Sequence, residues 1–356
     1  MSRKSLSKRL LPIAGGIGAA LAVREVIGSA REVDLNGQVA LITGGSRGLG
    51  LALARELADQ GCRLAICARD EAELLRAGED LERHGAQVIA VRCDVADKAD
   101  VDRMIAVVEE EFGRIDILVC NAGVMQVGQV DSMELEDFRQ AMDIMYWGVL
   151  YPILAALPAM RTRKQGRIAI ITSIAGKVSV PRMVPYDGAK SAAVGLAEGL
   201  RAELASDGIT VTTIVPGLMR TGSYLNAYFS GDEEGRETHY RLFTPISSLP
   251  LITASTDGAA RAFVRAIRRG AIEVVYPPIF APIARLHGLA PSLTIQALSV
   301  IDRLLPPSGD SETTVRGSTI DRQIESPVWR TLTALGRRGA ERFLQRPGPV
   351  SVPEPD

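Results

Sequence analysis

One turn near residue 45 limits what this chain can fold into. The run 39–43 is short and apolar, as in a buried parallel strand, and residues 49–60 after it have helical spacing. The turn between them reads Thr43-Gly-Gly-Ser-Arg-Gly-Leu-Gly50. Its glycines at 44, 48 and 50 allow a tight turn and a close approach of the backbone to a pyrophosphate at the start of the helix. The order strand, turn, helix therefore predicts a dinucleotide-binding unit.

Strand and helix patterns alternate onward to residue 276. Further strands are predicted at 63–67, 87–93, 115–120, 167–172, 210–215 and 272–275, and further helices at 71–84, 99–112, 135–157, 185–206 and 259–269. Pro152 and Pro158 are expected to kink or end the long helix at 135–157. The alternation predicts an α/β fold, a Rossmann-like doubly wound parallel sheet with helices on both faces, with ligands at the carboxyl ends of its strands.

Composition excludes several classes of protein. The 356 residues include 41 basic and 42 acidic ones, for a net charge of -1, so no overall basic field exists to hold nucleic acid. The 4 cysteines form no Cys-x-x-Cys pair, and the 3 histidines lie far apart in the sequence. We therefore expect reduced core thiols, no metal site and no nucleic-acid partner.

The end of the second strand, Cys67-Ala-Arg-Asp70, bears on which dinucleotide binds. An NAD site needs an acid there to accept hydrogen bonds from the ribose, whereas this chain has Ala68 followed by Arg69. Arg47, inside the glycine turn, is a second guanidinium, and two such groups bind a 2′-phosphate through charge-assisted hydrogen bonds. Asp70 is expected to cap the next helix. The sequence favours NADP(H), with NAD(H) as the alternative.

Three polar residues form a second constellation. Tyr186 and Lys190 are four residues apart on a predicted helix and share a face, while Ser173 follows the fifth strand. An ammonium near a phenol favours the phenolate, so the pKa of Tyr186 is expected below its usual value of about 10. Tyr186 would then act as a general acid and base, and the Ser173 hydroxyl would bind the substrate oxygen.

These motifs together resemble the short-chain dehydrogenase/reductase family, of the Ser-Tyr-Lys type with a TGxxxGxG cofactor motif. The matches are the glycine turn, Asn121-Ala-Gly123, Ser173 with Tyr186-Asp-Gly-Ala-Lys190, and Pro216-Gly217 followed by Thr221. The resemblance covers residues 36–276. It implies that Ser173, Tyr186 and Lys190 are catalytic and that Lys190 also holds the nicotinamide ribose.

The cofactor-binding residues follow from the same motifs and from the two arginines. They are Gly44, Ser46, Arg47, Gly48, Leu49, Gly50, Arg69, Asp94, Val95, Asn121, Ala122, Gly123, Tyr186, Lys190, Pro216, Gly217 and Thr221.

One position departs from the family pattern. The family usually has an asparagine in the long fourth helix, where it supports a water-linked proton path to the lysine, and here that position falls on Met145. Either the main-chain carbonyl of Met145 holds the water, or the chain is catalytically weak. The predicted function is an NADP(H)-dependent oxidoreductase that interconverts an alcohol and a ketone or aldehyde. The alternative is a dinucleotide-binding sensor or scaffold with little turnover.

Residues 218–250 are predicted to form a lid over the substrate. Tyr224, Phe229 and Phe243 are among its apolar side chains. They either line a pocket for a small hydrophobic or lipid-like alcohol or carbonyl compound, or pack on the sheet without touching it.

The two ends of the chain differ from its centre. We expect a basic and apolar leader at 1–35, a Rossmann-fold catalytic domain at 36–276, a mainly helical extension at 277–344 and a disordered tail at 345–356. Residues 2–9 carry four positive charges, and the uncharged run 10–23 is shorter than the about 20 residues of a membrane span. The leader is either a membrane anchor or interfacial segment, which we prefer, or a disordered or domain-packed segment. We expect a cytoplasmic, membrane-associated protein that forms a homodimer or homotetramer.

Replacing Arg69 with Asp is expected to shift the cofactor preference toward NAD(H), because a carboxylate repels a 2′-phosphate and accepts hydrogen bonds from ribose hydroxyl groups. The measurement is the ratio of kcat/KM for NADPH to that for NADH. An unchanged ratio in R69D would refute the assignment of Arg69.

Overall fold

The structure, a computed structural model, describes residues 32–250, 252–307, 309 and 313–346 of the chain. The anchor or leader expected within residues 2–23, and residues 347–356 of the expected tail, therefore lie outside the described residues. The first described residues pack on the body of the protein. The amide of Val33 donates to the carbonyl of Arg268 at 3.2 Å, and Leu35 is buried.

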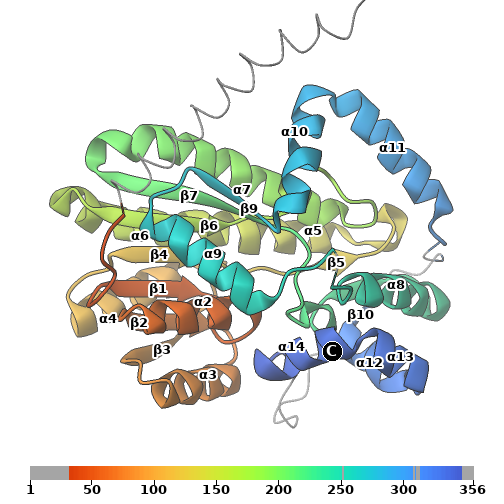
Figure 1. The fold of residues 1–356 in the computed structure, drawn as a ribbon, viewed down its shortest axis with the longest axis horizontal. Coiled ribbons are helices and arrows are strands. Elements are labelled where there is room, and N and C mark those ends of the chain that lie inside the picture. Colours follow the sequence, from red (N-terminus) through yellow and green to blue (C-terminus); the bar gives the residue numbers. More distant parts are fainter. Residues whose placement is uncertain (1–31, 251, 308, 310–312, 347–356) are drawn as a thin grey trace, which may run out of the picture.

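The doubly wound parallel sheet predicted from the sequence is confirmed (Figure 1). Seven strands lie in the order β3-β2-β1-β4-β6-β7-β9, and every neighbouring pair is parallel. Their bounds are Val39–Thr43 (β1), Arg63–Ala68 (β2), Val88–Arg92 (β3), Ile117–Cys120 (β4), Gly166–Ile171 (β6), Ile209–Pro216 (β7) and Glu273–Tyr276 (β9). The winding direction reverses between β1 and β4. Sheets of this kind bind their ligands in a crevice at this point, at the carboxyl ends of the strands.

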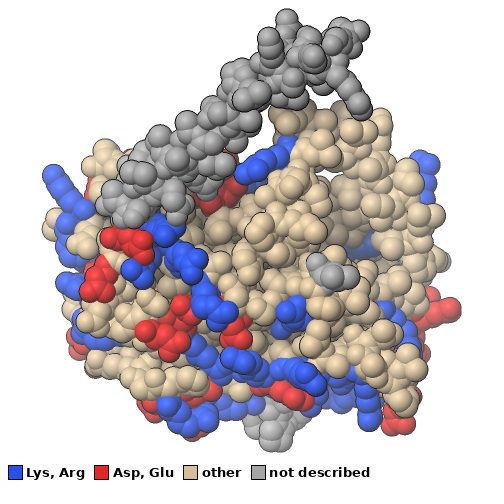
Figure 2. Space-filling model, in the orientation of Figure 1, with Lys and Arg blue, Asp and Glu red and all other residues tan. Residues whose placement is uncertain are grey.

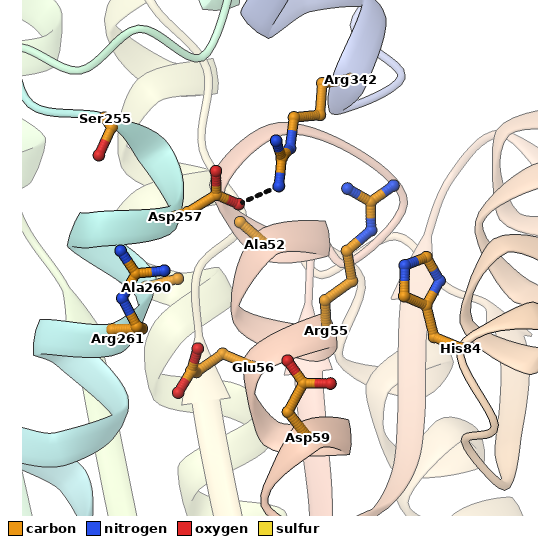
Figure 3. Close-up of a pocket in the computed structure, with 10 residues that line it drawn as sticks. All are labelled: Ala52, Arg55, Glu56, Asp59, His84, Ser255, Asp257, Ala260, Arg261 and Arg342. Carbon is orange, nitrogen blue, oxygen red and sulfur yellow. Dashed lines mark hydrogen bonds and ion pairs between the residues drawn. The ribbon is translucent and has the colours of Figure 1, made fainter.

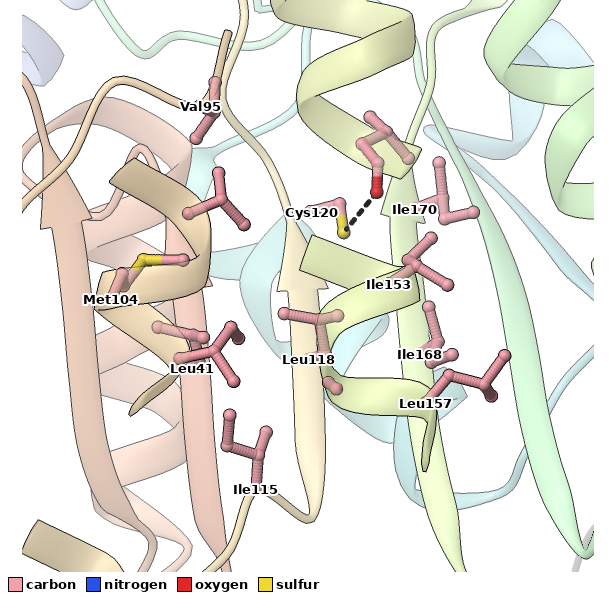
Figure 4. Close-up of a cluster of buried hydrophobic side chains, with 14 of the residues drawn as sticks. Leu41, Val95, Met104, Ile115, Leu118, Cys120, Ile153, Leu157, Ile168 and Ile170 are labelled. Carbon is pink, nitrogen blue, oxygen red and sulfur yellow. Dashed lines mark hydrogen bonds between the residues drawn. The ribbon is translucent and has the colours of Figure 1, made fainter. Parts of the chain in front are cut away.

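Helices cover both faces of this sheet. One face carries α2 (Gly48–Asp59), α3 (Glu71–Arg83) and α9 (Thr256–Arg268), and the other carries α4 (Lys98–Phe112), α6 (Gly148–Arg163) and α7 (Val184–Glu203). Successive residues of β1 serve the two faces: Leu41 packs with α4 and α6 (Figure 4), and Ile42 packs with α2. Because both faces are covered, all five residues of β1 are buried, which explains its unbroken apolar run.

The long helical stretch predicted at 135–157 consists of three segments. It begins as α5 (Leu135–Met142), passes through a π-helical segment, η2 (Asp143–Trp147), and continues as α6. Neither Pro152 nor Pro158 ends the helix, because α6 runs through both to Arg163. In the described part of the chain, residues 135–163 are the one helix long and apolar enough to cross a membrane, and half of its most apolar window is buried inside the protein.

A second, smaller core lies beyond the main sheet. A three-stranded sheet of β5 (Gln126–Val127), β8 (Tyr228–Ser230) and β10 (Thr314–Arg316) packs with α8 (Glu233–Ile246), α12 (Gly317–Gln323), α13 (Pro327–Leu332) and α14 (Ala334–Arg342). Tyr224, Phe229, Tyr240 and Trp329 are its buried aromatic residues. Tyr224 and Phe229 of the predicted lid therefore belong to a core.

Two helices project from the body at the edge of the molecule. α10 (Ala281–Leu289) and α11 (Pro291–Leu304) form a hairpin, visible in blue in Figure 1. Neither helix has a buried residue. Arg182, in the loop before α7, forms an ion pair with Asp302 of α11 at 2.7 Å and fixes the end of the hairpin to the body.

Replacing Asp321 with Ala is expected to lower the free energy of unfolding by about 2–4 kcal/mol, since buried donors lose their charged acceptor. Asp321 Oδ1 accepts hydrogen bonds from Tyr240 Oη at 3.0 Å and Arg337 Nη2 at 2.7 Å, and so joins α8, α12 and α14. Urea denaturation measures the change. The control D131A removes an exposed carboxylate and is expected to change stability by less than about 0.5 kcal/mol. Equal effects of the two substitutions would contradict this account of the second core.

Candidate functional site

The glycine turn joins the end of β1 to the start of α2. Gly44 and Gly48 have φ angles of +63° and +59°, in the left-handed region that favours glycine. A Cβ atom on Gly44 would lie 2.9 Å from Ala122 Cα, and one on Gly50 would overlap the carbonyl oxygen of Gly44. The turn therefore lies tightly against the end of β4, at the positive end of α2.

Asn121 fastens this turn to β4. Its side-chain amide donates to the carbonyls of Thr43 and Gly44, both at 3.0 Å, and Thr43 Oγ1 accepts from the amides of Asn121 at 3.0 Å and Ala122 at 3.2 Å. The sequence analysis assigned Asn121 to the cofactor, and in the structure its side-chain amide is bonded to the glycine turn. Its effect is to fix the start of α2 relative to the neighbouring strand.

Both arginines assigned to a 2′-phosphate lie beside carboxylates. Arg47 forms an ion pair with Glu73 in the first turn of α3, and Ser46 Oγ donates to the same carboxylate at 3.1 Å. Arg69 is 56% exposed and lies 3.9 Å from Asp94. Asp70 caps α3 as expected, through a hydrogen bond from the Glu73 amide at 2.9 Å. The sequence analysis did not identify Glu73 as a site residue. Its position three residues after the cap Asp70 was the one sequence feature that could have indicated it.

Asp94 and Val95 follow β3 and differ in their surroundings. Asp94 Oδ1 accepts from the Ala96 amide at 3.0 Å, and its side chain is 39% exposed at the rim of the crevice. Val95 is buried against Gly148 at the start of α6. Of the pair, Asp94 is therefore the side chain that a ligand at the rim would reach.

Ser173, Tyr186 and Lys190 come together at the carboxyl end of β6. Ser173 Oγ accepts from the Ala175 amide at 3.1 Å, and its hydroxyl lies near enough to the phenol of Tyr186 to influence the pKa of that group. Lys190 Nζ donates to the carbonyl of Ile171 at 2.8 Å and lies 5.8 Å from the centre of the Tyr186 ring. The geometry thus brings a hydroxyl, a phenol and an amine to one edge of the sheet.

Burial controls the protonation of this group. It raises the pKa of Tyr186 above its ordinary value, and the Ser173 hydroxyl offsets only part of that rise. Burial also lowers the pKa of Lys190 to about 8. The expectation that Lys190 lowers the pKa of Tyr186 is wrong here, because burial of the phenol raises that pKa and Lys190 Nζ donates to the carbonyl of Ile171. Tyr186 therefore carries its proton at neutral pH.

Met145 lies in η2, next to Gly123. It is fully buried, and a Cβ atom on Gly123 would lie 3.6 Å from its sulfur and 3.7 Å from Lys190 Nζ. The thioether and the ammonium therefore border the same side of Gly123. A π-helical segment at this point is a local irregularity of a kind that is frequent at functional sites.

The end of β7 forms the far side of the crevice. The amide of Gly217, next to Pro216, donates to the carbonyl of Tyr276 at 2.8 Å, and Thr221 Oγ1 accepts from the Ser223 amide at 3.2 Å. The ring of Phe280 covers Gly217, where a Cβ atom would overlap it. Sequence reasoning missed Phe280 because the matched motifs end before it.

A cavity of about 270 Å³ lies elsewhere, between α2 and α9 (Figure 3). Most of the side chains that line it are charged, among them Arg55, Glu56, Asp59 and Arg261. None of the site residues predicted from the sequence lines it, so it is not the crevice at the strand ends.

Comparison with known proteins gives concordant matches. A family model described as short chain dehydrogenase matches residues 38–227. An 11-beta-hydroxysteroid dehydrogenase A of Sesamum indicum is 32% identical over 257 residues, 72% of each chain. A dehydrogenase/reductase SDR family protein 7-like of Anopheles gambiae is 36% identical over 267 residues, 73% of this chain and 81% of that protein.

Solved structures share the fold. A short chain dehydrogenase/reductase from Burkholderia phymatum in complex with NAD has a TM-score of 0.67 and 25% identity, over 73% of this chain and 96% of that one. An actinorhodin polyketide ketoreductase with NADPH has a TM-score of 0.57 and 28% identity, over 67% of this chain and 95% of that one.

Asp187, next to Tyr186, provides a test of the electrostatics of this site. Its carboxylate is buried: Oδ2 accepts from the Val180 amide at 2.9 Å, and Oδ1 has no hydrogen-bond partner among the described residues. Burial raises the pKa of Asp187 to about 8. The folded protein therefore keeps a proton that the unfolded chain loses above a pH of about 4, and stability falls as the pH rises from about 4 to about 8.

Replacing Asp187 with Asn is expected to raise the free energy of unfolding at pH 7 by more than about 1.4 kcal/mol, the equivalent of one pKa unit, because no buried carboxyl is then left to ionise. Urea denaturation of both proteins between pH 4 and pH 8 measures the effect. If the stability of D187N falls with pH as steeply as that of the wild type, the raised pKa of Asp187 is contradicted.

Proposed function

The chain belongs to the short chain dehydrogenase family, and from this premise we propose that it is an NADP(H)-dependent oxidoreductase that interconverts a hydrophobic alcohol and its ketone or aldehyde. Membership of the family makes it an oxidoreductase that acts on CH–OH groups. One observation carries the finer proposal. Ser173, Tyr186 and Lys190 meet at the carboxyl edge of the sheet, where the glycine turn and Gly123 also lie.

The crevice residues fit a dinucleotide. The left-handed Gly44 and Gly48 bring the backbone to the positive end of α2, a suitable place for a pyrophosphate. Arg69 follows the neutral Ala68 at the end of β2, and Arg47 lies in the glycine turn; these two guanidinium groups support NADP(H). In the free protein Arg47 is held by Glu73, so we propose that a 2′-phosphate replaces Glu73 as the partner of Arg47.

The proposed mechanism follows from the protonation states. Bound NADPH supplies the hydride that reduces the carbonyl carbon. Ser173 donates a hydrogen bond to the carbonyl oxygen and stabilises the charge that develops on it. Tyr186, which holds its proton because burial raises its pKa, transfers that proton to the same oxygen. Lys190, whose Nζ lies 5.8 Å from the centre of the phenol ring, would hold the nicotinamide ribose, and the tyrosinate that remains takes a proton back from solvent.

We propose a lipid-like substrate and attachment to a membrane surface. The hairpin of α10 and α11 exposes a row of apolar side chains, with Leu289 86% and Leu304 80% exposed, and Figure 2 shows few charges over it. Phe280, which covers Gly217, directly precedes α10, so the hairpin adjoins the crevice. The four positive charges of residues 2–9 favour anionic headgroups. The similarity to a protein named 11-beta-hydroxysteroid dehydrogenase A also supports a large apolar substrate.

Replacing Tyr186 with Phe is expected to lower kcat by about 10²–10⁴-fold, the usual contribution of general acid catalysis. Affinity for NADPH and the melting temperature should stay near the wild-type values. The measurement is NADPH oxidation with a panel of hydrophobic ketones and aldehydes. The control Y151F changes a partly buried tyrosine of α6 and should keep full activity.

Two results would count against this proposal. Substantial turnover in Y186F would remove Tyr186 from the acid role. A wild-type protein that binds NADPH but turns over none of the panel would favour the sensor or scaffold.

A further inference from the structure

We propose that Gln345 binds the pyrophosphate of the dinucleotide, so that the carboxyl-terminal extension completes the cofactor site. The inference rests on the dinucleotide-dependent function proposed above. It adds a binding residue that lies outside every motif of the family resemblance and outside the matched residues 38–227.

The three glycines of the turn face different neighbours. Gly44 lies against Ala122, and Gly50 lies against the carbonyl of Gly44 and the side-chain amide of Asn121. Both glycines therefore face the end of β4. Gly48 faces the extension: its amide donates to the carbonyl of Phe343 at 2.8 Å, and a Cβ atom on it would overlap Gln345 Nε2. Gly48 directly opens α2, and the start of a helix after a glycine turn is where a pyrophosphate binds. The carboxamide of Gln345 thus borders the place where we expect the phosphates.

Asn226 sets the orientation of this carboxamide. Its Nδ2 donates to Gln345 Oε1 at 2.7 Å and to the main-chain carbonyl of Gln345 at 2.8 Å. With Oε1 engaged, the N–H groups are on the atom beside Gly48. No hydrogen bond joins Gln345 Nε2 to an acceptor among the described residues, although the residue as a whole is 6% exposed. A donor held in this way favours an anionic acceptor.

The segment that carries Gln345 is fixed at several points. The Phe343 ring is buried in the core between the sheet and α2, with the Arg55 guanidinium 5.5 Å from its centre. Arg342 forms an ion pair with Asp257 of α9 at 3.1 Å, drawn in Figure 3. α14 also packs so closely on the loop after β7 that a Cβ atom on Gly339 would overlap the carbonyl oxygen of Arg220. The donor is therefore positioned before a ligand arrives, which limits the entropic cost of binding.

The test is the affinity of the full-length protein for NADPH, measured by titration calorimetry. Q345A is expected to bind NADPH about tenfold more weakly, because one hydrogen bond to a charged group is lost. Q345E should bind still more weakly, because its carboxylate repels the pyrophosphate. Gln323 of the same extension is exposed at the end of α12, and the control Q323A should bind like the wild type.

A ligand without a pyrophosphate separates direct contact from a structural role. Adenosine 2′-phosphate should bind equally to the wild type, Q345A and Q345E. If NADH proves the tighter dinucleotide, NADH and adenosine replace the two ligands.

Three results are decisive. Wild-type or tighter NADPH binding by Q345A overturns the assignment of Gln345, and so does an equal loss of affinity for adenosine 2′-phosphate. If the wild-type protein binds neither NADPH nor NADH, the proposed function itself is rejected. This result differs from the first two because it is seen with the wild type alone, without any variant.

Discussion

The hydrogen bonds from Asn121 to the carbonyls of Thr43 and Gly44 are the interaction on which the site depends. β1 and β4 are adjacent in the sheet but far apart in the sequence, and the winding reverses between them. By satisfying the carbonyls of the turn, Asn121 fixes where α2 begins and which way its amides point. The glycine turn, the arginine at its centre and the extension that packs on Gly48 all take their positions from this junction.

Much of the fold follows from local sequence patterns. Strands buried on both faces are continuously apolar, helices are marked by their spacing, and caps such as Asp70 are local, so the order of elements and the sheet type were predictable. The meeting of Ser173, Tyr186 and Lys190 was predictable too, because the carboxyl ends of parallel strands share one edge. Neither proline of α6 ends the helix, since packing against the sheet holds the helix together across both of them.

The rest depends on long-range contacts that no local pattern encodes. Glu73 reaches Arg47 only because α3 packs beside the turn, and Phe280 and Gln345 come from segments beyond the matched motifs. The pKa of Tyr186 is raised by burial, and the Lys190 amine beside it donates instead to the carbonyl of Ile171. Helical spacing predicts that Tyr186 and Lys190 share a face, but it does not predict the bond from Lys190 to Ile171. The aromatic residues of the expected lid became a second core because β10 and α13 return to cover them.

The carboxyl-terminal extension links the two ends of the crevice. Phe280 covers Gly217 at one end, and Phe343 meets Gly48 at the other. The apolar hairpin of α10 and α11 begins next to Phe280. Transfer of deuterium to a hydrophobic ketone from NADPH that carries deuterium at both C4 positions of the nicotinamide tests the central claim most directly. The account predicts an alcohol that carries the label on its carbinol carbon, and ketones left unreduced while the label stays on the dinucleotide would contradict it.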